Sequence, residues 1–206
     1  MLDLAAILAQ SPENSFYSGV GSRRCEDPEI LGLMTRFARF MAERRWIMRS
    51  GAAPGPDTAF ERGAPLNLRR IYVPNASFER RKRSEIIVPK EVDLMTWLRA
   101  CLIAEQHHFL GRRMPQDVRD LMGRNVYQVL GDDLMTPSRF VICDAPFPVY
   151  DEQGRVQDVD GGTGMAVRLA YANNIPVVHL GTPEHRAQVE ALLNPPAPVR
   201  SSGPRP

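Results

Sequence analysis

The sequence has few cysteines, little net charge and no long apolar run. Its three cysteines, Cys25, Cys101 and Cys143, lie far apart without metal-ligand spacing, which argues against a disulfide scaffold and predicts no metal site. A net charge of +2 is too small to demand a nucleic-acid partner on charge alone. No run approaches the roughly 20 apolar residues of a membrane span, and Asp3 stands where a signal peptide carries positive charge. We therefore expect a cytoplasmic protein with no membrane partner.

Short apolar runs alternate with segments of helical spacing. The runs at 15–20, 46–49, 70–73, 140–143 and 176–180 are typical of buried strands. The intervening helices are predicted at 28–41, 57–63 and 161–171, with another over the first ten residues and a last one at 183–193. Strands that alternate with helices favour a parallel sheet covered on both faces. The predicted fold class is therefore α/β, Rossmann-like, with a mostly parallel sheet and helices on both faces.

The alternation breaks in the middle of the chain. From Pro74 to about Gly111 there is a charged stretch and then a predicted helix from Pro89 or Val92 to about Leu110, followed by another predicted helix at 115–130. We interpret about 75–113 as an insertion in a single domain that spans 1–193. The remainder, 194–206, reads NPPAPVRSSGPRP and has the composition of a disordered tail.

Three of the predicted strands end in loops of small residues. Gly21 and Ser22 follow the first strand, Gly51 and Gly55 follow the second, and Asp144 follows the fourth, ahead of a glycine run at 161–164. Ligands of open parallel sheets bind where the carboxyl ends of strands meet. Glycine lets backbone N–H groups approach an anion, and the helix that follows points its positive end at the same place. One such loop is often only a turn, but three on one edge predict a phosphate site.

The motifs of these loops resemble a known set. They are Gly21-Ser22-Arg23, then Ser50-Gly51-Ala52-x-x-Gly55-x-Asp57, then Arg124-Asn125, then Gly161-Gly162-Thr163-Gly164. In this order they resemble the motifs of the DprA/Smf DNA-processing proteins, over roughly 16–180 with the insertion excluded. Two features depart from that family: no histidine follows Asp57, and no winged-helix domain follows Leu193. The wider superfamily of DprA-like and LOG-type Rossmann domains is therefore the assignment that the resemblance supports.

The resemblance implies binding of single-stranded DNA, in support of recombination, with a recombinase as a further partner and a homodimer as the assembly. An alternative from the same superfamily is a protein that senses or sequesters a nucleotide or an ADP-ribose-like molecule. A third hypothesis is a nucleotide N-glycosidase that uses Asp144 or Asp160 as its acid. No cofactor is predicted.

The superfamily also offers a test for an enzyme. LOG-type phosphoribohydrolases carry PGG-x-GT-x-x-E, whose glutamate serves hydrolysis. The corresponding position here is Arg168, which stays protonated and cannot act as a general base. We therefore predict no catalytic residue of the LOG type, and expect Arg168 to add positive charge to the phosphate site.

The remaining candidates each have a structural and a functional interpretation. Arg23 is either a phosphate clamp or a solvated loop residue, and Asp57 binds a ribose hydroxyl, caps its helix or does both. Arg124-Asn125 lies mid-helix, where asparagine is a mediocre helix former, which favours a ligand contact. Asp144 either orients a sugar or caps a turn. The basic run Arg80-Arg81-Lys82-Arg83 is a candidate nucleic-acid backbone contact, although such runs are more often solvated loops.

Overall fold

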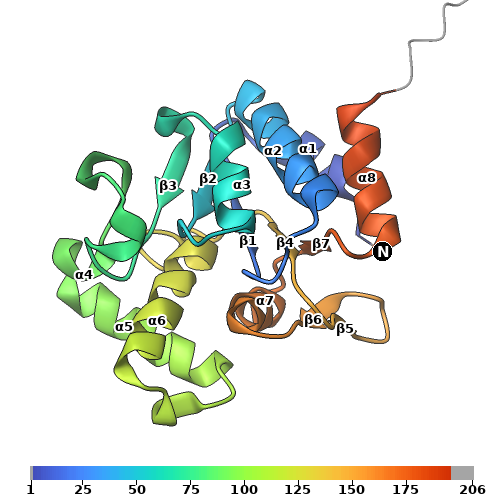
Figure 1. Ribbon diagram of the computed structural model, residues 1–206. Helices are drawn as coiled ribbons and strands as arrows, with labels where there is room; N and C mark the ends of the chain where they lie inside the picture. The colour runs from blue at the N-terminus through green and yellow to red at the C-terminus, as the bar shows by residue number, and fades with distance from the viewer. Residues whose placement is uncertain (1, 196–206) are drawn as a thin grey trace, which may run out of the picture.

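The core of the protein is a sheet of five parallel strands, seen edge-on in the computed structural model, which describes residues 2–195 (Figure 1). The strands are β1 (Phe16–Gly21), β2 (Ile47–Ser50), β3 (Arg69–Ile71), β4 (Val141–Asp144) and β7 (Val177–His179). Their order is β3-β2-β1-β4-β7, and each neighbouring pair is parallel. The predicted α/β fold with a mostly parallel sheet is therefore confirmed.

Helices cover both faces of this sheet, also as predicted. One face packs against α1 (Leu4–Gln10), α2 (Pro28–Glu43), α3 (Pro56–Gly63) and α8 (Pro183–Leu193). The other packs against α6 (Gln116–Leu130) and α7 (Gly162–Ala172), with α5 (Leu94–His107) behind α6 (Figure 1). The two faces are read directly from β4, where Ile142 belongs to the first core and Val141 and Cys143 to the second. This alternation is what a strand buried on both sides requires.

The helix expected from Pro89 or Val92 to about Leu110 is interrupted at Asp93. A four-residue helix α4 (Pro89–Val92) precedes α5, and Asp93 between them is extended, with φ −150° and ψ 107°. Its carboxylate accepts from the backbone N–H groups of Met95 and Thr96, at 2.9 and 3.2 Å. Asp93 therefore starts a new helix as its N-cap, a signal that the apolar spacing of the segment conceals.

A small hairpin after β4 was not predicted. Strands β5 (Val149–Tyr150) and β6 (Val156–Asp158) pair antiparallel in a separate sheet. They are too short to carry an alternating pattern, and side-chain bonds within their turn hold them together. Asp151 accepts from the backbone N–H groups of Gln153 and Arg155 and pairs with the Arg155 guanidinium at 2.7 Å.

Residues 75–113 contain α4 and α5 and the short 3-10 helices η2 (Phe78–Arg80), η3 (Arg83–Glu85) and η4 (Gly111–Arg113); a further one, η1 (Leu66–Leu68), precedes β3. That this segment is an insertion in one domain remains our proposal. The predicted disordered tail lies outside the described residues from 196 onward. Within 2–195, no helix is long and apolar enough to cross a membrane, and no group of three His, Cys, Asp or Glu side chains is arranged to hold a metal ion.

Candidate functional site

A cleft of about 260 Å³ opens at the carboxyl end of β1. The sheet order changes direction here: β2 and β3 lie on one side of β1, and β4 and β7 on the other. Gly21 at the end of β1 is in register with Asp144 at the end of β4. This is the switch point at which open α/β sheets bind their ligands.

Five separate segments line the cleft. They are the loop after β1, the loop after β2 with the start of α3, the 3-10 helix η2, the middle of α6 and the start of α7. The residues predicted from sequence that line it are Gly21, Ser22, Arg23, Asp57, Arg124, Asn125, Gly161, Gly162 and Thr163. The geometry thus brings together all residues of the first and third motifs, three of the four residues of the glycine run, and Asp57 of the second motif.

The other predicted residues do not line the cleft. Gly51 lies beneath it, where an added β-carbon would overlap the Arg124 guanidinium. Gly164 packs so closely on the β6 end that an added β-carbon would overlap the carbonyl oxygen of Val159. Ala52 is buried, and Gly55, with φ +87°, is the N-cap of α3. These small residues allow close packing and a left-handed backbone, and neither role requires a ligand.

Arg168 lies outside the cleft, where it forms contacts between secondary-structure elements. Its guanidinium pairs with Asp158 and donates to the carbonyl oxygen of His107 at 2.6 Å. It therefore joins α7 to β6 and to the end of α5. Arg168 lies one helical turn beyond Gly164, and its side chain points away from the cleft. The positive charge that we expected at the phosphate site is therefore neutralised by Asp158.

A buried ion pair forms the floor of the cleft. Asp57 is 3% exposed and Arg124 is 5% exposed, and Nη1 of Arg124 lies 3.5 Å from Oδ2 of Asp57. The same oxygen accepts from the backbone N–H groups of Gly51 and Ala53, at 3.2 and 3.3 Å. Burial raises the pKa of Asp57, whereas Arg124 and the two N–H groups act to lower it. Asp57 thus orders the loop after β2 and positions Arg124 toward the cleft.

Hydrogen-bond donors in this floor have no partners among the described residues. They are Nε of Arg124 and the side-chain nitrogen of Gln128, which is 1% exposed and also lines the cleft. A buried donor without a partner calls for an acceptor. The Nε atoms of Arg49, Arg69, Arg81 and Arg119 are also without a partner in residues 2–195, but none of these residues lines the cleft. Sequence reasoning missed Gln128, although its place one turn beyond Arg124 on the same helix would have indicated it.

The start of α7 adds more donors. Gly161 is the N-cap at φ +78°, and its N–H donates to Oδ1 of Asp160 at 2.8 Å, which leaves the N–H groups of Gly162 and Thr163 as the first open donors of the helix. The amide of Asn125 donates to the carbonyl of Gly162 at 3.3 Å and holds α7 against α6. The amino end of an 11-residue helix favours an anion.

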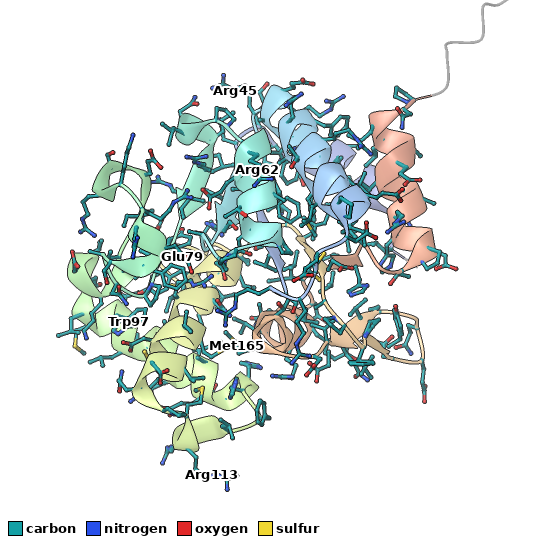
Figure 2. All side chains as sticks on the ribbon, viewed as in Figure 1. Arg45, Arg62, Glu79, Trp97, Arg113 and Met165 are labelled. Atoms are coloured by element: carbon teal, nitrogen blue, oxygen red, sulfur yellow. The ribbon has the colours of Figure 1, made fainter. Side chains whose placement is uncertain are left out.

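Phe78 is a second lining residue that the sequence analysis did not single out. It comes from η2 and precedes Glu79, which Figure 2 labels, and it lines the cleft together with residues of α6 and α7. The Arg124 guanidinium lies 5.7 Å from the centre of its ring. An aromatic ring beside a guanidinium and open donors is typical of sites that take a base or a sugar together with a phosphate.

Charge at the mouth of the cleft comes from two exposed arginines. Arg24 pairs with Asp160 at 2.8 Å, which ties the loop after β1 to the loop before α7. Arg23 is exposed and no salt bridge to it is found in residues 2–195. The mouth therefore carries one positive charge in excess, on Arg23.

The basic run does not form one patch. Arg81 pairs with buried Glu61, and Arg83 pairs with Glu91. Arg80 and Lys82 are exposed. Half of the charge in this run is thus neutralised within the protein.

Asp144 lies in a neighbouring corner and not in the cleft lining. It contacts the Cys25 thiol, whose pKa burial raises to about 12 with a further contribution from Asp144. An added β-carbon at Gly181 would lie 3.1 Å from Oδ1 of Asp144. Nearby, Nε2 of His179 is 2.8 Å from the carbonyl oxygen of Ala145. The contacts of Asp144 are internal to the fold.

The comparisons with known proteins bear on the fold. No protein-family model and no curated protein matches the sequence. The structure is similar to DNA processing protein A from Helicobacter pylori, which has been described for its single-stranded DNA binding mode. The TM-score is 0.52 at 16% sequence identity, over 92% of this chain and 81% of that one. At this identity the similarity shows a shared fold of the DprA type.

Proposed function

We propose that this protein binds single-stranded DNA, with one nucleotide of the strand in the cleft at the end of β1. The observation that carries the proposal is the pair of buried donors without partners, Nε of Arg124 and the amide of Gln128, at the amino end of α7. The fold shared with a protein that binds single-stranded DNA supports it. Support of recombination, with a recombinase as partner and a homodimer as the assembly, belongs to the same proposal.

The donors in the cleft suit a phosphodiester. The backbone N–H groups of Gly162 and Thr163 and the Arg124 guanidinium are donors, whereas the N–H of Gly161 already donates to Asp160. The one carboxylate in the lining, Asp57, is satisfied by three donors. Within residues 2–195, the unpaired positive charge of the cleft lies on Arg23, at its mouth. There it would contact the phosphate backbone of a strand that enters the cleft. Charge of this kind makes affinity fall with salt.

Removing both mouth arginines is expected to weaken binding of a short oligothymidylate. The double variant Arg23→Ala/Arg24→Ala should lose about tenfold in affinity. The slope of the salt dependence should flatten by roughly 0.7, the contribution of one phosphate contact on a single strand, because Arg24 is already paired with Asp160. Fluorescence anisotropy over a series of potassium chloride concentrations measures both. Arg139→Ala is the matched control, because Arg139 is exposed at the opposite, amino end of β4. Equal losses in the two variants would count against the cleft.

A second function, binding of a free nucleotide, is favoured by the size of the cleft over binding of an ADP-ribose-like molecule. About 260 Å³ is slightly below the range of roughly 300–1,000 Å³ for ligand pockets, so it suits one nucleotide better than a dinucleotide. Mass spectrometry of the small molecules released by denaturation tests it. A nucleotide in stoichiometric amount, together with no affinity for oligothymidylate, would favour this function over the first.

We predict no release of base from nucleoside monophosphates. The LOG-type glutamate position holds Arg168, which is paired with Asp158. The alternative acids of a glycosidase, Asp160 and Asp144, both lie outside the cleft lining, Asp160 in an ion pair with Arg24 and Asp144 against Cys25. Chromatography of AMP and CMP after long incubation measures base release. Turnover that persists in a Gly162→Ala variant with a narrowed cleft would place a hydrolase elsewhere in the protein.

A further inference from the structure

Phe147 is an exposed aromatic side chain held in an unfavourable backbone conformation. It is 77% exposed, and its φ of +55° lies in the left-handed region that bulky residues avoid. Proline stands on each side, at 146 and 148, and restricts the backbone of the loop. An apolar ring in water contributes nothing to the core of the protein. A strained backbone conformation at an exposed loop is common at binding sites, so it supports a functional hypothesis for Phe147.

The loop that carries Phe147 is fastened to the rim of the cleft. The carbonyl oxygen of Pro146 accepts from the backbone N–H of Asp160 at 2.9 Å. Asp160 pairs with Arg24, which lines the cleft, and is followed by Gly161, which also lines it. Phe147 is therefore one residue away from a backbone hydrogen bond to the rim of the cleft.

We propose that Phe147 is a stacking platform for an unpaired base next to the nucleotide in the cleft. This inference rests on the proposed function, and it names what the site takes: a strand of at least two nucleotides and not a free mononucleotide. The cleft holds about one nucleotide, so the neighbouring base lies outside it, over the rim. Aromatic side chains stack on unpaired bases of any sequence, because every base has a π face.

The neighbouring aromatic residue is less suited to this role. Tyr150 is 39% exposed, and its hydroxyl is hydrogen-bonded to Thr182 at 2.6 Å, which fixes the side chain against the end of β7. Phe147 makes no such bond and presents its ring to solvent. Phe109 is as exposed, at 76%, but it follows α5, outside the cleft lining. Phe109 therefore provides a matched control.

The test compares Phe147→Ala with Phe109→Ala on two probes, a short oligothymidylate and thymidine monophosphate. Phe147→Ala should lower the affinity for the oligonucleotide by roughly 5- to 100-fold, the effect of removing one stacked aromatic residue, and leave the affinity for the mononucleotide unchanged. Phe147→Tyr should retain the affinity. In Phe147→Trp, binding of the oligonucleotide should quench a fluorescence component absent from wild type.

The outcomes separate the two proposals. Oligonucleotide affinity in Phe147→Ala equal to that of wild type, or equal to that of Phe109→Ala, overturns the stacking role and leaves the proposed function intact. Parallel loss of affinity for both probes would show that Phe147 shapes the cleft instead of stacking, and also overturns it. A wild-type protein that binds the mononucleotide but no oligonucleotide contradicts the proposed function itself.

Discussion

Replacing Arg124 with methionine is expected to lower the free energy of unfolding by about 3–5 kcal/mol, the cost of leaving a buried charge without its partner. Asp57 is 3% exposed and would retain only the two N–H donors of Gly51 and Ala53. Methionine fills much of the volume of the arginine stem, so the loss reports mainly on charge and hydrogen bonding. Urea unfolding followed by tryptophan fluorescence measures it.

The double variant Asp57→Asn/Arg124→Met is the control. Removing both charges should restore part of the loss, since no uncompensated ion remains buried. A single-variant loss below about 1 kcal/mol would show that the pair is solvated, as surface ion pairs are, and would contradict its place in the cleft floor.

The Arg124→Met variant should also depend on pH in a defined direction. Burial raises the pKa of Asp57 and Arg124 opposes that rise, so removing Arg124 moves the folded-state pKa further above the unfolded value. The folded variant then binds a proton that the unfolded chain releases, and its stability falls as pH rises through the folded pKa. The loss relative to wild type should thus be smaller at about pH 5 than at about pH 8. A loss that grows toward low pH would mean that Asp57 is held ionised by other groups.

Two glycines at the start of α7 should differ in how much their replacement by alanine lowers the stability of the protein. Gly164→Ala is expected to destabilise the protein by about 3 kcal/mol, because the added methyl group overlaps the backbone oxygen of Val159, which cannot move as a side chain would. Gly162→Ala should leave stability within about 1 kcal/mol of wild type, since the nearest atom to its added methyl is Cε of Met122, at 3.4 Å.

The same pair separates packing from binding. The methyl group of Gly162→Ala projects beside the cleft lining, so this stable variant should lose affinity for oligothymidylate, whereas Gly164→Ala should bind normally at temperatures where it remains folded. Thermal unfolding and anisotropy on both variants measure this. Full affinity in Gly162→Ala would remove the start of α7 from the binding site.

The fold could be predicted from the sequence because each central strand is a short apolar run that is followed by a helix with a clear start. Asp27-Pro28 before α2 and Gly161 before α7 are examples. The break at Asp93 and the β5–β6 hairpin escaped prediction, because a local cap and a turn held by Asp151 determine them and apolar spacing does not.

The site could be predicted only from the rule that ligands of parallel sheets bind at the carboxyl ends of the strands. That rule brings together Gly21, Gly162 and Asp57. It does not distinguish a glycine that leaves room for a ligand, such as Gly162, from one that leaves room for the protein itself, such as Gly51 or Gly164. Phe78 comes from a distant segment, and the partner of Arg168 becomes visible only when β6 is placed beside α7.

The central claim is that a single strand lies in the cleft at the end of β1, and crosslinking tests it most directly. An oligonucleotide that contains 4-thiothymidine is irradiated with the wild-type protein, and the modified peptides are identified by mass spectrometry. We predict adducts within residues 21–24, 161–163 and at Phe78 and Phe147, reduced by unlabelled oligothymidylate. Adducts confined to the exposed residues Arg80 and Lys82, or to α8, with none in the lining segments, would contradict the account.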